Sequence, residues 1–170
     1  MKNLIDVFWK VCLFKLKPQD LPSSSFLMLA SIVAYGIASA LVGLTSLPPV
    51  AAILSAVLDV ALMGAMTQLL LWIRELGPRF QQTFTALMGT GAILGFLALP
   101  LFFMQMQLGD EGVVLPSLFI LGLMFWNLSI IGHILRHAIS APFFVGVMLA
   151  VIYMYVSISV MRSLFSTVAQ

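Results

Sequence analysis

The segment VAAILSAVLDVALMGAMTQLLLWI, residues 50–73, carries one charged side chain, Asp59, in an otherwise uncharged run. A helix of about 20 apolar residues is long enough to cross a hydrocarbon core of ~30 Å. Further runs of similar length and little charge occupy residues 26–46, 83–104, 114–135 and 142–161. The sequence therefore predicts an all-α, polytopic membrane protein built as a bundle of five transmembrane helices.

The composition excludes an ordinary soluble domain. Hydrophobic residues make up 62% of the 170-residue chain and charged residues only 8%, whereas a soluble domain carries about a quarter charged residues. We expect two parts, an amphipathic cytoplasmic interfacial helix with a hinge at residues 1–25 and a five-span membrane domain at residues 26–170. The single cysteine, Cys12, rules out an intramolecular disulfide and a cysteine metal cluster.

The basic residues predict an orientation. If the five runs cross the membrane alternately, seven of the eight Lys and Arg residues fall on one side and only Arg162 falls on the other. Basic residues near the ends of spans stay in the cytoplasm. We therefore expect a cytoplasmic N terminus and, after five crossings, a C terminus on the opposite, periplasmic side.

Residues 1–17 show the pattern of an amphipathic helix. At about 100° per residue, Lys2, Asp6, Lys10 and Lys17 gather on one face, opposite apolar side chains. A basic amphipathic helix of this kind suits the membrane interface, and the alternative is a docking helix for a partner protein. Candidate contacts to lipid headgroups are Lys2, Lys10, Lys17, Arg136 and His137.

Asp59 is the acidic residue deepest within a predicted span. It lies about 14 Å from the outer end of the second span at 1.5 Å per residue, which is near the bilayer midplane. An ionisable residue at this depth is a functional hypothesis by default. It is either a proton or cation site, or a protonated, hydrogen-bonded group that ties helices together. Tyr35 and Tyr153 lie at similar depths and are its candidate partners.

Other polar residues in the spans suggest structural roles. Gln68 and Asn127 lie at comparable depth and are candidates for an interhelical hydrogen bond. His133 and His137 are four residues apart, a spacing that permits joint metal ligation, but the sequence shows no third ligand nearby. We therefore expect no metal site and no cofactor.

Small residues recur every four positions in three of the spans: Gly91 and Gly95, Ala30, Ala34 and Ala38, and Ala61 and Ala65. Such faces allow helices to approach closely, either within the bundle or against another membrane protein or a second copy. The connections are short. Pro100 lies inside the third span and is expected to kink that helix or end its regular part early, before a third connection at residues 105–112.

Two segments support a family resemblance. One is LGPRFQQTFTAL, residues 76–87, followed by an apolar run ending in LPL at residues 99–101; the other is FWNL, residues 125–128, leading to ILRHAIS at residues 134–140. Together with five short-looped spans, these segments resemble the bacterial branch of the Yip family, whose eukaryotic members are Rab-interacting. The resemblance covers residues 50–165. It implies a five-span membrane protein without enzymatic activity and supplies no catalytic residue.

The sequence contains no catalytic motif, and nothing in it predicts nucleic-acid binding. We expect a non-enzymatic accessory or scaffold protein that acts through contacts with lipid and other helices. The rival hypothesis is a small transporter or channel that uses Asp59. A transporter should show a water-reachable cavity at Asp59 and broken helices, whereas a scaffold should show a dry, packed site.

Overall fold

The structure is a computed structural model that describes residues 4–165, and at residues 4, 109–111 and 165 it describes the backbone alone. Within this range the chain is helical and contains no strand. The elements are α1 (Leu4–Cys12), η1 (Pro18–Asp20), α2 (Ser25–Gly43), α3 (Pro49–Ile73), η2 (Gly77–Arg79), α4 (Phe80–Gly112), α5 (Val114–Ala138) and α6 (Phe143–Phe165), where η denotes a 3₁₀ turn.

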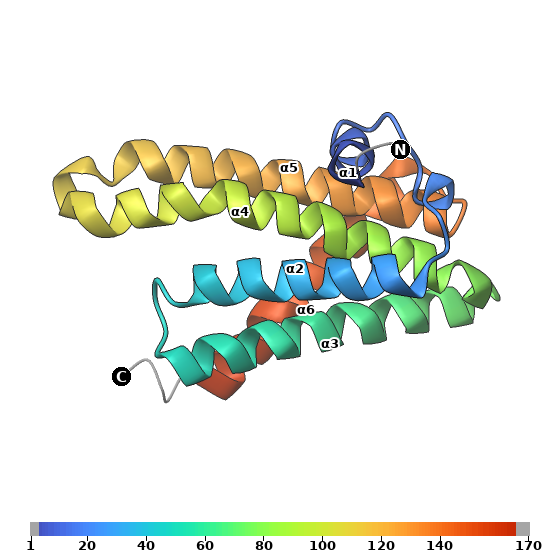
Figure 1. Cartoon of the computed structure of the whole chain (residues 1–170), viewed down its shortest axis with the longest axis horizontal. Helices are drawn as coiled ribbons and strands as arrows, with labels where there is room; N and C mark the ends of the chain where they lie inside the picture. The colour runs from blue at the N-terminus through green and yellow to red at the C-terminus, as the bar shows by residue number, and fades with distance from the viewer. Residues whose placement is uncertain (1–3, 166–170) are drawn as a thin grey trace.

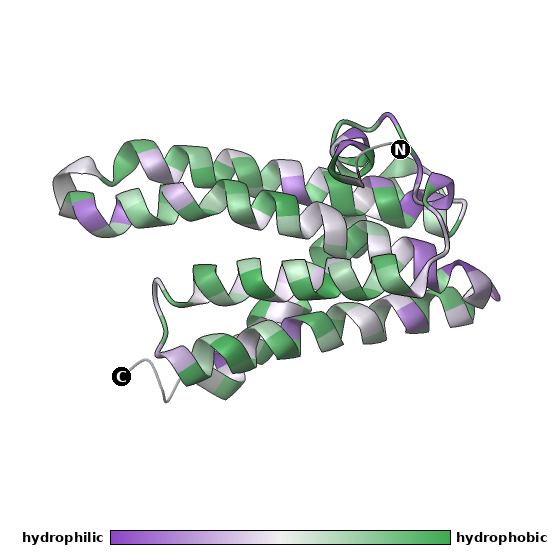
Figure 2. Cartoon of the chain, viewed as in Figure 1, coloured by the Kyte–Doolittle hydropathy of each residue, from purple (hydrophilic) through white to green (hydrophobic). Residues whose placement is uncertain are grey.

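Five of the helices, α2 to α6, are long and apolar enough to cross a membrane, which confirms the predicted fold class. Large apolar side chains are exposed around the bundle, among them Phe26 at 76% and Trp72 at 71%. Figure 2 shows hydrophobic residues along all five helices and hydrophilic residues on η1 and near the helix ends beside it. Apolar outer surfaces of this kind fit lipid rather than water.

Adjacent helices pack in a chain in which α2 lies along α3 and α4, α4 lies along α5, and α5 lies along α6. In Figure 1, α2 to α5 run roughly side by side and α6 passes obliquely behind them, while α1 is seen nearly end-on beside α5. We call the end with the α2–α3 turn, residues 44–48, the α2–α3 end. The opposite end, with residues 74–79 and 139–142, is the η2 end.

Glycines set the closest helix contacts. A Cβ atom at Gly91 would lie 2.7 Å from the Tyr35 ring, and one at Gly95 would lie 2.9 Å from Cβ of Ala38. The Gly91 and Gly95 face of α4 is therefore occupied by α2 of the same chain. At the η2 end a Cβ at Gly146 of α6 would lie 2.1 Å from the carbonyl oxygen of Gly132 in α5.

Three helices end in the same way without a glycine. Phe14, Glu75 and Ser140 have φ angles of 60°, 56° and 55°, in the left-handed region. At each of these helix ends, the amide of the next residue bonds back to a carbonyl five positions earlier in the chain, as in Lys15 to Lys10 at 2.9 Å. This is the Schellman motif, in which glycine is the usual left-handed residue.

Of the two effects predicted for Pro100, a kink or an early end of the regular helix, the early end was wrong. α4 continues without a break to Gly112, so that the expected loop at residues 105–112 is helical and only Val113 separates α4 from α5. Proline removes one backbone hydrogen bond, and the helix accommodates that loss. The extension is tied to α5, because the Gln105 amide donates to the Ser117 hydroxyl at 3.1 Å.

The N-terminal helix is shorter than predicted. Among the described residues, α1 ends at Cys12 rather than at residue 17. The chain turns there because α5 holds the following loop: the Trp126 indole donates to the Cys12 carbonyl at 3.1 Å, and the His133 ring contacts the Leu16 carbonyl at 3.2 Å. The α1 face with Phe8 and Cys12 is buried, so α1 docks on its own bundle.

Candidate functional site

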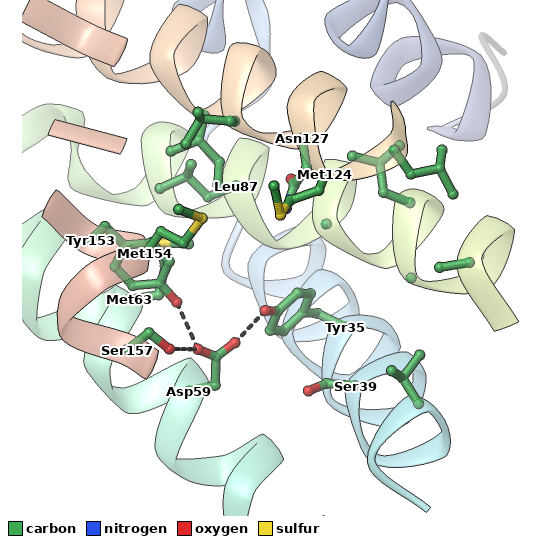
Figure 3. Close-up of a pocket in the computed structure, with 18 of the residues that line it drawn as sticks. Tyr35, Ser39, Asp59, Met63, Leu87, Met124, Asn127, Tyr153, Met154 and Ser157 are labelled. Carbon is green, nitrogen blue, oxygen red and sulfur yellow. Dashed lines mark hydrogen bonds between the residues drawn. The ribbon is translucent and has the colours of Figure 1, made fainter. Parts of the chain in front are cut away.

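Asp59 is the centre of a hydrogen-bond cluster formed by three helices (Figure 3). Oδ1 accepts hydrogen bonds from the Tyr153 hydroxyl at 2.8 Å and the Ser157 hydroxyl at 2.9 Å, and Oδ2 accepts one from the Tyr35 hydroxyl. Asp59 is on α3, Tyr35 on α2, and Tyr153 and Ser157 on α6. The structure thus brings both tyrosines suggested by depth to the carboxyl group.

Local packing explains why these hydroxyls reach Asp59. The Tyr35 ring lies against Gly91, where the absence of a side chain leaves room for it. Tyr153 and Ser157 are four residues apart and so share one face of α6. This spacing is visible in the sequence and could have pointed to Ser157, which the sequence analysis missed.

The cluster forms part of the wall of a cavity of about 460 Å³ in the middle of the bundle. Most of the lining is apolar, with Leu87 and Met124 among its members, and the polar members besides the cluster include Ser39 and Asn127. A mostly apolar cavity with a few convergent polar groups is the usual form of a small-ligand site. The site around Asp59 is therefore a lined cavity rather than a fully packed contact.

The cluster can hold Asp59 in either protonation state. An ionised carboxylate accepts all three hydrogen bonds, because a carboxylate is an acceptor only. A protonated carboxyl group would donate to one of the hydroxyls, which can also accept. The three hydroxyls can therefore act as donors or as acceptors at this carboxyl group.

The predicted hydrogen bond between Gln68 and Asn127 is not formed. The Gln68 side chain lies on the exposed side of α3, whereas Asn127 of α5 lines the Asp59 cavity. Depth along a helix predicts level but not direction, and these two residues point to different surroundings. Within the described range, the Asn127 amide has no hydrogen-bond partner, so that it is available to a ligand in the cavity.

The candidate headgroup residues are placed in three ways. Lys2 lies outside the described residues. Lys10 pairs with Asp6 at 2.7 Å on the surface of α1, and Lys17 is exposed at the start of η1. Arg136 is partly buried, with its guanidinium 5.4 Å from the Phe143 ring at the start of α6.

His133 and His137 of α5 lie where the N-terminal segment packs on that helix. The rings of His133 and His137 meet edge to face with centroids 4.7 Å apart, and the His137 carbonyl accepts from the Gln19 amide. No group of three or more His, Cys, Asp or Glu side chains that could hold a metal occurs in the described part of the chain.

A second group of hydrogen bonds, which was not predicted from the sequence, holds the η2 end together. The Gln82 amide donates to the Gln19 and Leu21 carbonyls at 3.2 and 2.7 Å, and Arg79 donates to the Ala138 carbonyl at 3.0 Å and the Ser140 hydroxyl at 3.1 Å. These contacts join segments about 60 residues apart in the sequence. Arg79 therefore acts as a structural tie between η2 and the end of α5.

Comparisons with known proteins add no relative. No family model matches the chain, no curated protein matches it, and no solved structure matches it. The functional argument therefore depends on the geometry of the Asp59 cavity.

Proposed function

We propose that this chain is a non-enzymatic integral membrane protein that binds a proton or a small monovalent cation at Asp59, as a small transporter or channel. The observation that carries this proposal is the cavity beside an intramembrane carboxyl group that three hydroxyls contact. Carboxylate and hydroxyl oxygens are the ligands preferred by hard cations. Ionisable groups inside membranes usually mark ion or proton pathways.

The experiment uses purified protein in sealed liposomes. A lumenal pH-sensitive dye reports proton entry under an imposed proton gradient, and uptake of radioactive sodium reports cation entry. We expect flux above that of empty liposomes for the natural protein and a loss of most of that flux for Asp59→Asn. Ser129→Ala is the matched control, because the Ser129 hydroxyl donates only within its own helix, to the Phe125 carbonyl at 2.9 Å.

Two outcomes would overturn this proposal. One is natural protein that gives no proton or sodium flux above empty liposomes. The other is an Asp59→Asn variant that folds and keeps the natural flux, because the carboxyl group would then have no part in ion handling.

A second candidate is the accessory or scaffold protein expected from the Yip resemblance. Its support is that α2 to α6 show no break in the described range, unlike the interrupted helices common in transporters. Ala61 and Ala65 also lie on the exposed side of α3, where another helix could approach closely. Affinity purification in mild detergent with mass spectrometry tests this candidate: a stoichiometric membrane partner lost on Ala61→Leu supports it, and its absence opposes it.

The location that we propose is a bacterial inner membrane, with the N terminus in the cytoplasm and the C terminus in the periplasm. The support is the seven-to-one distribution of basic residues. In this orientation the η2 end faces the cytoplasm and the α2–α3 end faces the periplasm.

A further inference from the structure

A second cavity continues from the Asp59 cluster to the α2–α3 end. Its volume is about 490 Å³, and it shares Asp59, Ser39, Val42 and Ser157 with the first cavity. The additional lining comes from the end of α2 and its turn, from α3 and from α6: Gly43, Ser46, Leu47, Ser55, Met161 and Arg162. We call this second cavity the vestibule. The α2–α3 turn is part of its lining, so the vestibule extends from Asp59 to the α2–α3 end of the bundle.

The side of the cluster toward the η2 end is different. A smaller cavity of about 170 Å³ lies there, and it shares only Met63 and Tyr153 with the Asp59 cavity. Both side chains are buried, with 6% and 9% of their surface exposed. Met63 and Tyr153 therefore form the partition between Asp59 and the cavity nearer the η2 end.

The two routes also differ in chemistry. The vestibule presents four serine hydroxyls, Asp59 and Arg162, whereas the smaller cavity is lined by Leu, Ile and Met side chains besides Thr67 and Tyr153. Water enters a cavity when several polar groups can bond to it, and apolar cavities stay dry. An ion gains from the oxygens of the vestibule and loses its hydration in the apolar cavity.

We propose that water and a small cation or proton reach Asp59 from the α2–α3 end, and that Tyr153 and Met63 close the route toward the η2 end. This inference rests on the proposed function. It adds the end of the bundle from which Asp59 is reached, and it names Tyr153 and Met63 as the gate that closes the other route. Tyr153 links the two, because its hydroxyl bonds to the same carboxyl group. A cation bound at Asp59 competes with the Tyr153 hydroxyl for that oxygen and loosens the partition.

Cysteine labelling tests the route without any ion flux. In a Cys12→Ser background, which removes the only natural cysteine, single cysteines replace Ser55 and Thr67. Both lie on α3, Ser55 in the vestibule and Thr67 in the smaller cavity. Sealed vesicles of each orientation receive MTSET, a membrane-impermeant cationic thiol reagent, and labelling after denaturation gives the total thiol.

We expect Ser55→Cys to be labelled only when the α2–α3 end is exposed, and Thr67→Cys to be protected in both orientations. Adding Tyr153→Phe should raise labelling of Thr67→Cys from the α2–α3 end several-fold. Protection of Ser55→Cys in both orientations would overturn the vestibule, and unchanged protection of Thr67→Cys after Tyr153→Phe would overturn the gate. Gel filtration in mild detergent checks that each variant is folded.

The labelling and flux experiments fail separately. If Ser55→Cys is labelled but Asp59→Asn keeps the natural flux, the vestibule stands and the proposed function falls. If flux requires Asp59 but Ser55→Cys is protected from both sides, the proposed function stands and this route is wrong.

Discussion

At the scale of single residues, Asp59 shows how one side chain can organise three helices. It receives hydroxyls from α2 and α6 while belonging to α3. In a low-dielectric interior such bonds are strong, and a group that loses its partner is costly. The same residue therefore contributes both to the fold and to the proposed chemistry, and substitutions must separate these roles.

Asp59→Leu should destabilise the folded protein by roughly 1–3 kcal/mol, because three hydroxyls lose their shared acceptor. Asp59→Asn keeps a polar oxygen at the same position and should unfold close to the natural protein. The measurement is the unfolding midpoint in mild detergent with added denaturing detergent. Equal stability of Asp59→Leu and the natural protein would contradict the importance of the cluster to the fold.

Cys12 should be chemically inert in the folded protein. Its side chain is fully buried, and that burial raises the pKa of the thiol from 9.0 to about 11. The reactive thiolate is therefore scarce below about pH 11. The contribution of the raised pKa to stability is full below pH 9.0 and is lost as the pH rises towards about 11. We expect little alkylation by iodoacetamide at pH 8 before denaturation and full alkylation afterwards; rapid alkylation of folded protein would show that α1 leaves its site.

At the scale of elements, the closest contact between α5 and α6 gives a testable expectation. At Gly146 a Cβ atom would meet the Gly132 carbonyl oxygen at 2.1 Å and Cβ of Arg136 at 2.9 Å. Because backbone cannot move aside as a flexible side chain can, Gly146→Ala should push α6 away from α5. We expect a markedly lower unfolding midpoint. Gly122→Ala is the matched control in α5, where nothing lies within 4 Å of the added atom, and an equal loss there would contradict this explanation.

The left-handed helix ends predict a stabilising change. Glu75 is exposed and has φ 56°, a conformation that costs a non-glycine residue roughly 1–2 kcal/mol. Glycine removes this strain but loses more entropy on folding, so that Glu75→Gly should stabilise by roughly 0.5–1 kcal/mol. Ser140→Gly should stabilise the protein less, because it removes the hydroxyl that accepts a hydrogen bond from Arg79 at 3.1 Å. A larger gain at Ser140 than at Glu75, in the same unfolding assay, would contradict this account.

The sequence predicted which segments form membrane-spanning helices. It predicted less well where the helices end and which way their side chains point. The spans follow from length and apolarity, as at residues 50–73, and the level of Tyr35, Asp59 and Tyr153 follows from the helical rise. The end of α4 was missed because the polar residues of the expected connection, residues 105–112, continue the helix. The hydrogen bond predicted for Gln68 and Asn127 is not formed, because level along a helix does not say which way a side chain points. The end of α1 depends on Trp126, more than 100 residues away.

At the scale of the whole molecule, we expect the termini on opposite sides of a membrane, because the described residues form five helices long and apolar enough to cross one. Reporter fusions after Lys17 and at Gln170 should therefore report opposite compartments, with the Lys17 fusion in the cytoplasm because seven of eight basic residues accompany it. Alkaline phosphatase and a fluorescent protein that folds only in the cytoplasm give complementary signals. Both fusions on one side would mean that one of the five helices does not cross.

The position of α1 also has a consequence for synthesis. α1 is made before the residues that it packs on: Gly89 follows Phe8 by about 80 residues, and Trp126 follows Cys12 by 114. At the usual 5–20 residues per second, the ribosome needs roughly ten seconds to supply those residues. During this interval Phe8, Val11 and Cys12 have no bundle to cover them. The nascent chain therefore exposes the apolar face of α1 until α5 is made, and a ribosome stalled before α5 would leave α1 without its hydrogen bond from Trp126.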